Sequence, residues 1–378
     1  MSTPARELVI DLDAIAANTA VLAQRSATAG LMAVVKADAY GHGLVPSARA
    51  AQRGGATWLG VALLDEALAL RSAGVEGPVL AWLLGVDEDW AGAINADVDL
   101  SVSAEWVLTA ISGAAMAAGR TARVHLKVDT GLGRSGAPAD DWSDLVAAAR
   151  RAESDGSVRV VGVWSHFAYA DAPGHPTIDR QVDAFRDAVA VAERAGLRPD
   201  VRHLANSAAT LTRPDTHFDL TRPGLAVYGL SPLVDAPSKS LGLEPAMSLR
   251  ASLVLVKRVS AGHGVSYMHR YVTNAETTLG LVPLGYADGV PRSATNVGPV
   301  LAGGRRRTVA GVVCMDQFVV DFGDDGASVG DVVTLFGSGA DGEPTAQDWA
   351  NATGTISYEI VSRVGPRVRR RYIGGTTP

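Results

Sequence analysis

The sequence predicts an α/β fold: a (β/α)8 barrel of the TIM type over residues 11–238, followed by a mostly-β carboxyl-terminal domain over residues 239–378. In the first region, apolar runs alternate with alanine-rich amphipathic stretches, whereas after about residue 240 short β-rich runs follow one another between glycine and acidic turns. A chain of 378 residues is also too long for one ordinary domain and can form two, each with its own core.

Eight runs in the first region have the length and composition of buried strands. They cover residues 31–35, 57–63, 78–84, 98–102, 122–128, 159–165, 201–205 and 225–229. Amphipathic stretches such as 64–73, 104–118 and 178–195 are long enough to cross back over a parallel sheet. Eight such units close a barrel, and its chemistry is then expected at the carboxyl ends of the strands.

The second region is predicted to be a separate β-rich domain. Its strand-like runs are 251–259, 277–282, 307–313, 318–321 and 331–336. The polar segment 235–242, which contains Pro237 and two serines, is predicted to connect the two domains.

Composition narrows the range of functions. The chain has 34 Lys and Arg residues against 40 Asp and Glu residues, so it offers no basic footprint for nucleic acid, and a small-molecule partner is expected. Cys314 is the single cysteine, which excludes an intrachain disulfide framework and, with no secretory segment at the start, predicts a cytoplasmic protein. The sequence has no apolar run long enough to span a membrane.

Lys36 ends an apolar run and precedes a turn-rich stretch in which Gly41 and Gly43 allow a tight exit into a helix. An amine in partly apolar surroundings is more often neutral, as a nucleophile that forms a Schiff base with a carbonyl cofactor must be. The structural alternative is a lysine whose stem packs while its amine reaches solvent.

Further polar residues fall at or just after predicted strand ends, namely Asp129, Arg134, His166, Asn206 and Ser207. His125, Lys127 and Asp129 alternate with apolar residues and therefore share one face of a strand. A lysine facing inward needs compensation, and an ion pair between Lys127 and Asp129 is one way to provide it. Ser207 begins a helical stretch, where it could cap the helix or bind an anion.

Nine blocks of the sequence resemble bacterial alanine racemases, which are pyridoxal-phosphate enzymes of fold type III. The blocks are AVVKADAYGHG (33–43), HLKVDTGLGRSG (125–136), SHFAYAD (165–171), HLANSAA (203–209), TRPGLAVYG (221–229), VSY (265–267), PLGYADG (283–289), VCMDQ (313–317) and TISYEI (355–360). They occur in the family's order and span nearly the whole chain, so the resemblance implies an isomerase with pyridoxal 5'-phosphate as cofactor.

The resemblance implies a role for each matching residue. Lys36 and Tyr267 are the two bases that remove and return the α-proton, and Arg222 faces the pyridine nitrogen of the cofactor. Other expected cofactor contacts are Tyr40, Arg134, His166, Asn206, Ser207, Gly224, Leu225 and Tyr358. Expected substrate contacts are Arg134, Met315, Tyr286 and Tyr271.

The arginine carries a mechanistic consequence. A guanidinium can only donate hydrogen bonds, so the ring nitrogen opposite Arg222 remains an unprotonated acceptor and a weaker electron sink. This restraint favours return of the proton over transamination. Local alternatives are a core histidine for His166, a packed tyrosine for Tyr267 and a core methionine for Met315.

The family also implies features of the assembly. An amino-terminal strand at residues 5–10 pairs with the second domain, and Lys127 corresponds to a lysine that is often carbamylated to orient the arginine at position 134. A head-to-tail homodimer shares its two active sites, each completed by the partner's second domain. The chain departs from the family at Met268, because a glycine usually follows the catalytic tyrosine, so rate and substrate range are expected to differ more than reaction type.

The reaction expected from the resemblance is interconversion of L-alanine and D-alanine, which supplies D-alanine for peptidoglycan. Serine or broad-spectrum racemases differ from alanine racemases by small changes in the pocket wall. Fold type III decarboxylases are another alternative, but they usually place a glutamate opposite the ring nitrogen and a cysteine near the substrate. A non-catalytic pyridoxal-phosphate carrier would lack the second domain, and a purely structural module would not need Lys36, Arg222 and Tyr267 together.

Overall fold

The computed structural model describes residues 5–375, and these form two compact units. The barrel unit contains residues 15–39 and 43–243. The β unit contains, within the described part of the chain, residues 5–14, 40–42 and 244–375. In the part of the chain that is described, no helix has the length and apolar character needed to cross a membrane.

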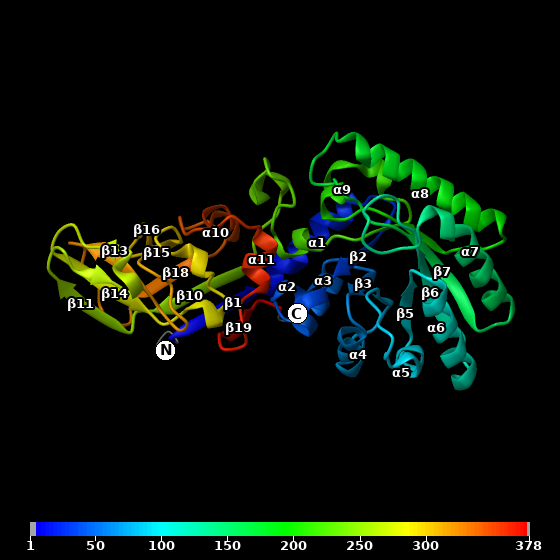
Figure 1. Ribbon diagram of the computed structural model, residues 1–378, viewed down its shortest axis with the longest axis horizontal. Helices are drawn as coiled ribbons and strands as arrows, with labels where there is room; N and C mark the ends of the chain where they lie inside the picture. Colours follow the sequence, from blue (N-terminus) through cyan, green and yellow to red (C-terminus); the bar gives the residue numbers. More distant parts are fainter. Residues whose placement is uncertain (1–4, 376–378) are drawn as a thin grey trace. The chain divides into compact units, whose positions relative to one another are not determined.

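The barrel unit contains an eight-stranded parallel sheet in the order β8-β7-β6-β5-β4-β3-β2-β9. Figure 1 labels β2, β3, β5, β6 and β7 of this sheet. The strands are β2 (Gly30–Val34), β3 (Trp58–Val61), β4 (Val79–Ala81), β5 (Val98–Val102), β6 (Ala122–Lys127), β7 (Val158–Trp164), β8 (Val201–His203) and β9 (Leu220–Thr221). Backbone bonds from Asp219 N to Arg202 O (3.0 Å) and from Arg222 N to Ala205 O (2.8 Å) link the two ends of the sheet. The predicted barrel is confirmed.

Helices connect the barrel strands, and Figure 1 shows α4 to α8 along the outside of the sheet. The helices are α1 (Leu12–Arg25), α2 (Lys36–Tyr40), α3 (Leu44–Arg53), α4 (Leu64–Ser72), α5 (Trp90–Asn95), α6 (Glu105–Ala118), α7 (Ala139–Ser154), α8 (Pro176–Arg194) and α9 (Ser207–Thr212). Helix α8 buries Ile178, Val182, Phe185 and Val189, which recur every three or four residues and so lie on one face. Each such side chain contributes roughly 1.5–3 kcal/mol on burial.

Two predicted strands are wrong. The run 251–259 is interrupted at Leu253 and Val254 and contains the end of β10 (Met247–Ser252) and all of β11 (Leu255–Val259). Residues 225–229 do not form a strand; Leu225–Tyr228 forms a 3₁₀ turn, η2, and the eighth strand is the shorter β9 just before it. The run is fully buried, and a short buried apolar run has no periodicity that separates strand from helix.

The β unit is built on a nine-stranded sheet in the order β11-β14-β17-β16-β15-β18-β10-β1-β19. These strands are β1 (Arg6–Asp11), β10 (Met247–Ser252), β11 (Leu255–Val259), β14 (Thr277–Val282), β15 (Pro299–Ala302), β16 (Arg305–Ala310), β17 (Phe318–Gly323), β18 (Val332–Phe336) and β19 (Arg369–Ile373). Strand β1 pairs antiparallel with β10 and parallel with β19. The mostly-β second domain is thereby confirmed. Strand β19, with the sequence RRRYI, lies at the sheet edge and has no apolar alternation that could predict it.

Candidate active site

The backbone turns sharply directly after Lys36. Ala37, Asp38 and Ala39 all have φ between 52° and 56°, so the first residues of α2 follow a left-handed path. This conformation costs L-residues about 1–2 kcal/mol each and needs support from the surroundings. The Asp38 carboxylate accepts from Leu44 N (2.7 Å), and the Glu66 carboxylate accepts from Ala37 N. The position of the lysine at the carboxyl end of β2 is therefore held by side chains from outside the strand.

Four cationic side chains act on one another in the barrel unit. Burial is the main cause that lowers the pKa of Lys36, and the positive charge of Arg134 lowers it further. Burial followed by Arg222 and Arg134 lowers the pKa of Lys127 to about 7. The carboxylates that oppose these effects, Glu66 and Asp129, are already bound to backbone N–H groups. A cluster of this kind favours an anionic ligand.

Lys127 and Asp129 satisfy different partners. The Lys127 amine donates to Ser135 Oγ and lies 4.2 Å from the centroid of the Trp164 ring. Asp129 Oδ1 accepts instead from the N–H groups of Gly131 and Leu132, both at 2.9 Å, and so shapes the loop after β6. That loop carries Arg134, which is exposed to solvent.

Arg222 is buried at the end of β9 and donates to four groups. Its Nη1 donates to His203 Nδ1 (3.1 Å), and its Nη2 faces Ser165 O (2.7 Å), Leu204 O (3.2 Å) and His166 Nδ1 (3.3 Å). Burial lowers the pKa of Arg222 to about 9, so the guanidinium remains protonated at neutral pH. Burial and the Arg222 charge lower the pKa of His166, which therefore accepts this bond as a neutral ring.

Asn206 and Ser207 divide two roles at the start of α9. The Asn206 Oδ1 accepts from Ala209 N (3.1 Å), so asparagine is the N-cap and Ser207 is the first helical residue. Ser207 Oγ accepts from Gly224 N (2.9 Å) and Ala226 N (3.3 Å), which ties α9 to η2. The hydroxyl hydrogen of Ser207 remains available to donate to a ligand.

In the β unit, Tyr267 lies on a strained turn. The 3₁₀ turn η4 (Tyr267–His269) joins β12 (Gly264–Val265) to β13 (Tyr271–Val272), and the Tyr267 side chain is 69% exposed. Met268 has a φ of 61°, a left-handed conformation that glycine adopts without cost. Methionine at position 268, where the family usually has glycine, therefore adds backbone strain to the turn. Ser266 Oγ holds the turn by donating to Val312 O (2.7 Å).

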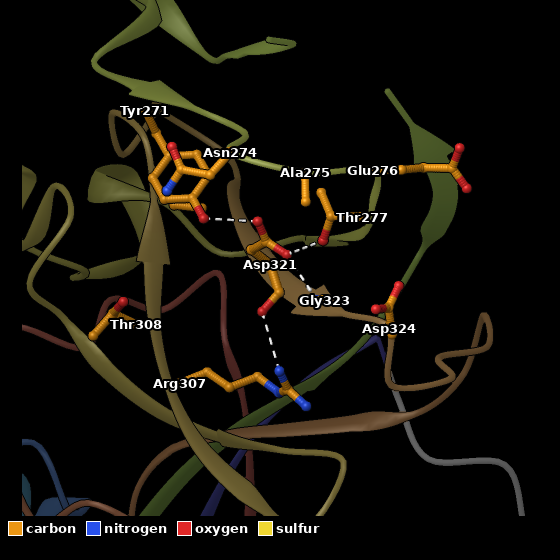
Figure 2. A pocket seen from close by; sticks show the side chains of 11 residues that line it. Tyr271, Asn274, Ala275, Glu276, Thr277, Arg307, Thr308, Asp321, Gly323 and Asp324 are labelled. Atoms are coloured by element: carbon orange, nitrogen blue, oxygen red, sulfur yellow. Dashed lines mark hydrogen bonds between the residues drawn. The ribbon is translucent and has the colours of Figure 1, made fainter. Parts of the chain in front are cut away.

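Tyr271 anchors the base of the same hairpin. Its hydroxyl donates to Asp321 Oδ2 (2.7 Å), and Thr277 also donates to this carboxylate, as Figure 2 shows. Burial and the Asp321 carboxylate raise the pKa of Tyr271 to about 12, so the phenol stays protonated. These residues line an open cavity of about 380 Å³ with Arg307 and Thr308 at its lower edge.

The remaining predicted residues of the β unit lie in pairs. Backbone bonds from Tyr286 N to Cys314 O and from Ala287 N to Met315 O, both 3.0 Å, place Tyr286 beside Met315. Both side chains are exposed, at 41% and 53%. The rings of Tyr40 and Tyr358 lie with centroids 6.1 Å apart.

Two residues of the site, Trp164 and His203, were not predicted from the sequence. Trp164 lies at the end of β7, where its ring contacts Lys127 and lies 4.8 Å from the Arg222 guanidinium carbon. It stacks on His203 with centroids 5.6 Å apart and an interplanar angle of 4°. Both residues end barrel strands, so the same strand-end rule that selected His166 could have found them.

Family models, curated relatives and solved structures of alanine racemases match this chain over nearly its whole length. Residues 10–232 match the model of the alanine racemase N-terminal domain, and residues 246–372 match that of the C-terminal domain. An alanine racemase of Frankia casuarinae is 62% identical over 366 residues, which cover 97% of this chain and 95% of the relative. The crystal structure of alanine racemase from D-cycloserine producing Streptomyces lavendulae has a TM-score of 0.98 at 57% identity and covers 100% of this chain and 99% of its own. The alanine racemase from Bacillus anthracis with bound L-Ala-P has a TM-score of 0.89 at 34% identity, with 99% and 96% covered.

Proposed function

Because this chain belongs to the alanine racemase family, we propose that it interconverts L-alanine and D-alanine with pyridoxal 5'-phosphate as cofactor. The observation that carries this proposal is the cationic cluster of Lys36, Lys127, Arg134 and Arg222. The cofactor offers a phosphate and a phenolic oxygen, and the substrate offers a carboxylate, so the charges match. The D-alanine formed is proposed to supply peptidoglycan synthesis.

The donor set of the barrel unit fits this cofactor. Lys36 would supply the amine that joins its aldehyde, Arg222 would donate to the ring nitrogen, and Arg134 would donate to the phenolic oxygen. Ser207 would donate its hydroxyl hydrogen to the phosphate beside the turn at Gly224 and Leu225, while Asn206 caps the start of α9. The resemblance also implies cofactor contacts for His166 and, in the β unit, for Tyr40 and Tyr358, whose rings lie with centroids 6.1 Å apart. When bound, the cofactor stabilises the carbanion that loss of the α-proton leaves.

Two bases on opposite faces of the substrate move the proton. Burial lowers the pKa of Lys36, so its amine is more readily neutral and able to take a proton on one face. Tyr267 takes or returns the proton on the other face. Met315 offers its backbone N–H to the substrate carboxylate, and Tyr271 and Tyr286 narrow the space around the substrate methyl group.

The exposure of Tyr267, Tyr286 and Met315 supports a shared site. Exposed side chains of this size are expected where a partner covers them. We propose a homodimer in which the β unit of one copy supplies these residues to the barrel of the other, so that neither copy is complete alone.

Arg222 restrains the chemistry. Its guanidinium stays protonated and donates to four protein acceptors, so it can only donate to the ring nitrogen as well. With the cofactor bound, its ring nitrogen would then remain unprotonated, and withdrawal of electrons into the ring would be limited. This favours return of the proton over transfer of the amino group.

Lys127 is proposed to be carbamylated. A pKa of about 7 leaves much of its amine neutral, and a neutral amine can add to carbon dioxide with loss of one proton. The carbamate formed is an anion that would offset the charges of Arg134 and Arg222. It would also hold Arg134 towards the cofactor.

Lys36 labelling tests the cofactor assignment. The purified protein is expected to be yellow, and borohydride reduction followed by peptide mapping should place the pyridoxyl group on Lys36. A label on another lysine would contradict this assignment.

Circular dichroism of L-alanine, L-serine and L-lysine incubated with the enzyme tests the substrate. Loss of optical signal with alanine well ahead of serine and lysine is the expected result, whereas equal rates would indicate a broad-spectrum racemase. Loss of the amino acid with release of carbon dioxide would indicate the decarboxylase alternative.

A further inference from the structure

A chain of buried hydrogen bonds runs from Arg222 through the barrel interior. His203 Nδ1 lies 3.1 Å from Arg222 Nη1, His203 Nε2 lies 2.8 Å from His125 Nδ1, and His125 Nε2 lies 3.0 Å from Asp99 Oδ2. His203, His125 and Asp99 lie on β8, β6 and β5, Arg222 directly follows β9, and each of the four is at most 4% exposed. Arg123 closes the far end by donating its Nε to Asp99 Oδ1 (2.6 Å).

The two ends of the chain determine where every proton lies. Arg222 can only donate, so His203 Nδ1 carries no hydrogen. Burial alone would raise the pKa of Asp99, but the hydrogen bonds from His125 and Arg123 lower it, so Asp99 is ionised. An ionised carboxylate can only accept hydrogen bonds, so His125 Nε2 carries a hydrogen. Burial and the Arg222 charge lower the pKa of His203, which is therefore neutral and has its one hydrogen on Nε2. His203 Nε2 then donates to the bare Nδ1 of His125, and all three bonds run in one direction.

Two packing features keep the rings in this arrangement. The Trp164 ring stacks on His203 with an interplanar angle of 4°. At Gly162 on β7, an added Cβ would lie 2.3 Å from His125 Nδ1, so glycine leaves the space that the histidine ring occupies. The φ of Gly162 is not in the left-handed region, and room for His125 is thus the reason for glycine here.

We propose that Asp99 is a positioning residue for the reaction: through His125 and His203 it fixes the orientation of Arg222 towards the cofactor nitrogen. This proposal rests on the function proposed above. A carboxylate in direct contact with Arg222 would take up the N–H groups that face the cofactor. The two neutral imidazoles of His125 and His203 keep the negative charge of Asp99 away from Arg222. Of these two rings, only His203 accepts from Arg222, and the donor is Nη1.

Neutron diffraction of the perdeuterated holoenzyme tests the proton assignment directly. Deuterons are expected on Nε2 of both His125 and His203, with Nδ1 of both rings bare. A deuteron on Nδ1 of either histidine would overturn the proposal. This measurement does not depend on activity, whereas lack of racemisation by the wild-type enzyme would count against the proposed function itself.

Asp99→Asn tests the consequence, with Asp219→Asn as a matched control. Asp219 forms a similar ion pair with Arg202 (2.6 Å), but among the described residues this pair is not hydrogen-bonded to a histidine. In Asp99→Asn the single amide oxygen is expected to face the Arg123 cation, which turns the NH2 group towards His125 Nε2. Both histidines must then move their hydrogens to Nδ1, where His203 would face an Arg222 donor.

The expected result is a change in the ¹⁵N signals of His203 and a roughly 10- to 100-fold loss of racemisation, comparable to the removal of outer partners of metal-bound histidines. The ratio of transamination to racemisation should rise, because Arg222 no longer restrains the ring nitrogen. Gly162→Ala, which keeps Asp99 but displaces His125, should act in the same direction. Equal losses in Asp99→Asn and Asp219→Asn, or an unchanged ratio and unchanged ¹⁵N signals in Asp99→Asn, would refute the positioning role.

Discussion

At the scale of single residues, the surroundings decide which lysine performs which task. Lys127 ends β6, whereas Lys36 follows β2 as the first residue of α2, and burial lowers the pKa of each. Lys127 is almost fully buried and lies against Trp164, whereas Lys36 is half-buried at the start of the left-handed turn. The first arrangement suits a group that stays in place, as the proposed carbamate would, and the second suits an amine that must reach a substrate.

Replacement of Tyr267 by phenylalanine should affect the two directions of racemisation unequally. Loss of a general acid–base group costs roughly 10²- to 10⁴-fold, and in the proposed mechanism this change removes the base on one face only. Lys36→Ala should abolish both cofactor attachment and the other base. Isotope exchange at the α-carbon, measured from each enantiomer, distinguishes the faces. Equal and mild effects from both enantiomers in Tyr267→Phe would argue against two bases.

Lys127 should make the stability of the cofactor-free protein depend on pH. Its folded pKa of about 7 lies below the ordinary value of 10.5, so the unfolded chain binds the extra proton between these values. The free energy of unfolding should therefore rise as pH increases from about 7 to about 10, by on the order of 4 kcal/mol in total. Urea unfolding in carbonate-free buffer measures this slope. Lys127→Met should flatten it, whereas Lys257→Met at an exposed site should not.

At the scale of elements, the hairpin that carries Tyr267 combines strain with anchors. Ser266 and Met268 have left-handed backbone conformations, and bonds from Ser266 to Val312 and from Tyr271 to Asp321 hold the turn. The position of the Tyr267 hydroxyl thus depends on strands β17 and β13 as much as on the turn itself.

Tyr271→Phe separates an anchoring role from a role in the pocket wall. The variant keeps the ring but loses a hydrogen bond to a carboxylate, worth roughly 1.5–3 kcal/mol. If the hydroxyl acts as an anchor, kcat should fall with little change in the preference for alanine over serine. Tyr372→Phe on β19 is the control for loss of a tyrosine hydroxyl in the same unit. A changed substrate preference with unchanged kcat would assign Tyr271 to the wall alone.

At the scale of the whole molecule, the proposed shared site predicts complementation between inactive variants. Mixing Lys36→Ala with Tyr267→Phe should give mixed dimers in which one of the two sites has both bases. Random exchange makes about half of the dimers mixed, so activity should approach roughly a quarter of wild type. Native mass spectrometry verifies the exchange. Verified exchange without recovery would show that each chain completes its own site.

The sequence by itself determined the barrel, the β-rich second part and the place of Lys36. These follow from local patterns: apolar runs of strand length, amphipathic stretches between them, and a lysine before two glycines. Roles such as those of Arg222 and Tyr267 came from the resemblance to a family and not from the pattern.

Tertiary structure alone decided how these parts work together. Leu225–Tyr228 forms a 3₁₀ turn that the sequence did not predict, because a fully buried apolar run gives no periodic signal. Hydrogen bonds from Gly224 N and Ala226 N to Ser207 Oγ support this turn. Asp99, His125 and His203 lie far apart in the sequence, and barrel closure brings them into one chain of hydrogen bonds. The proton positions depend on donors and acceptors at both ends of that chain, so no local pattern could specify them.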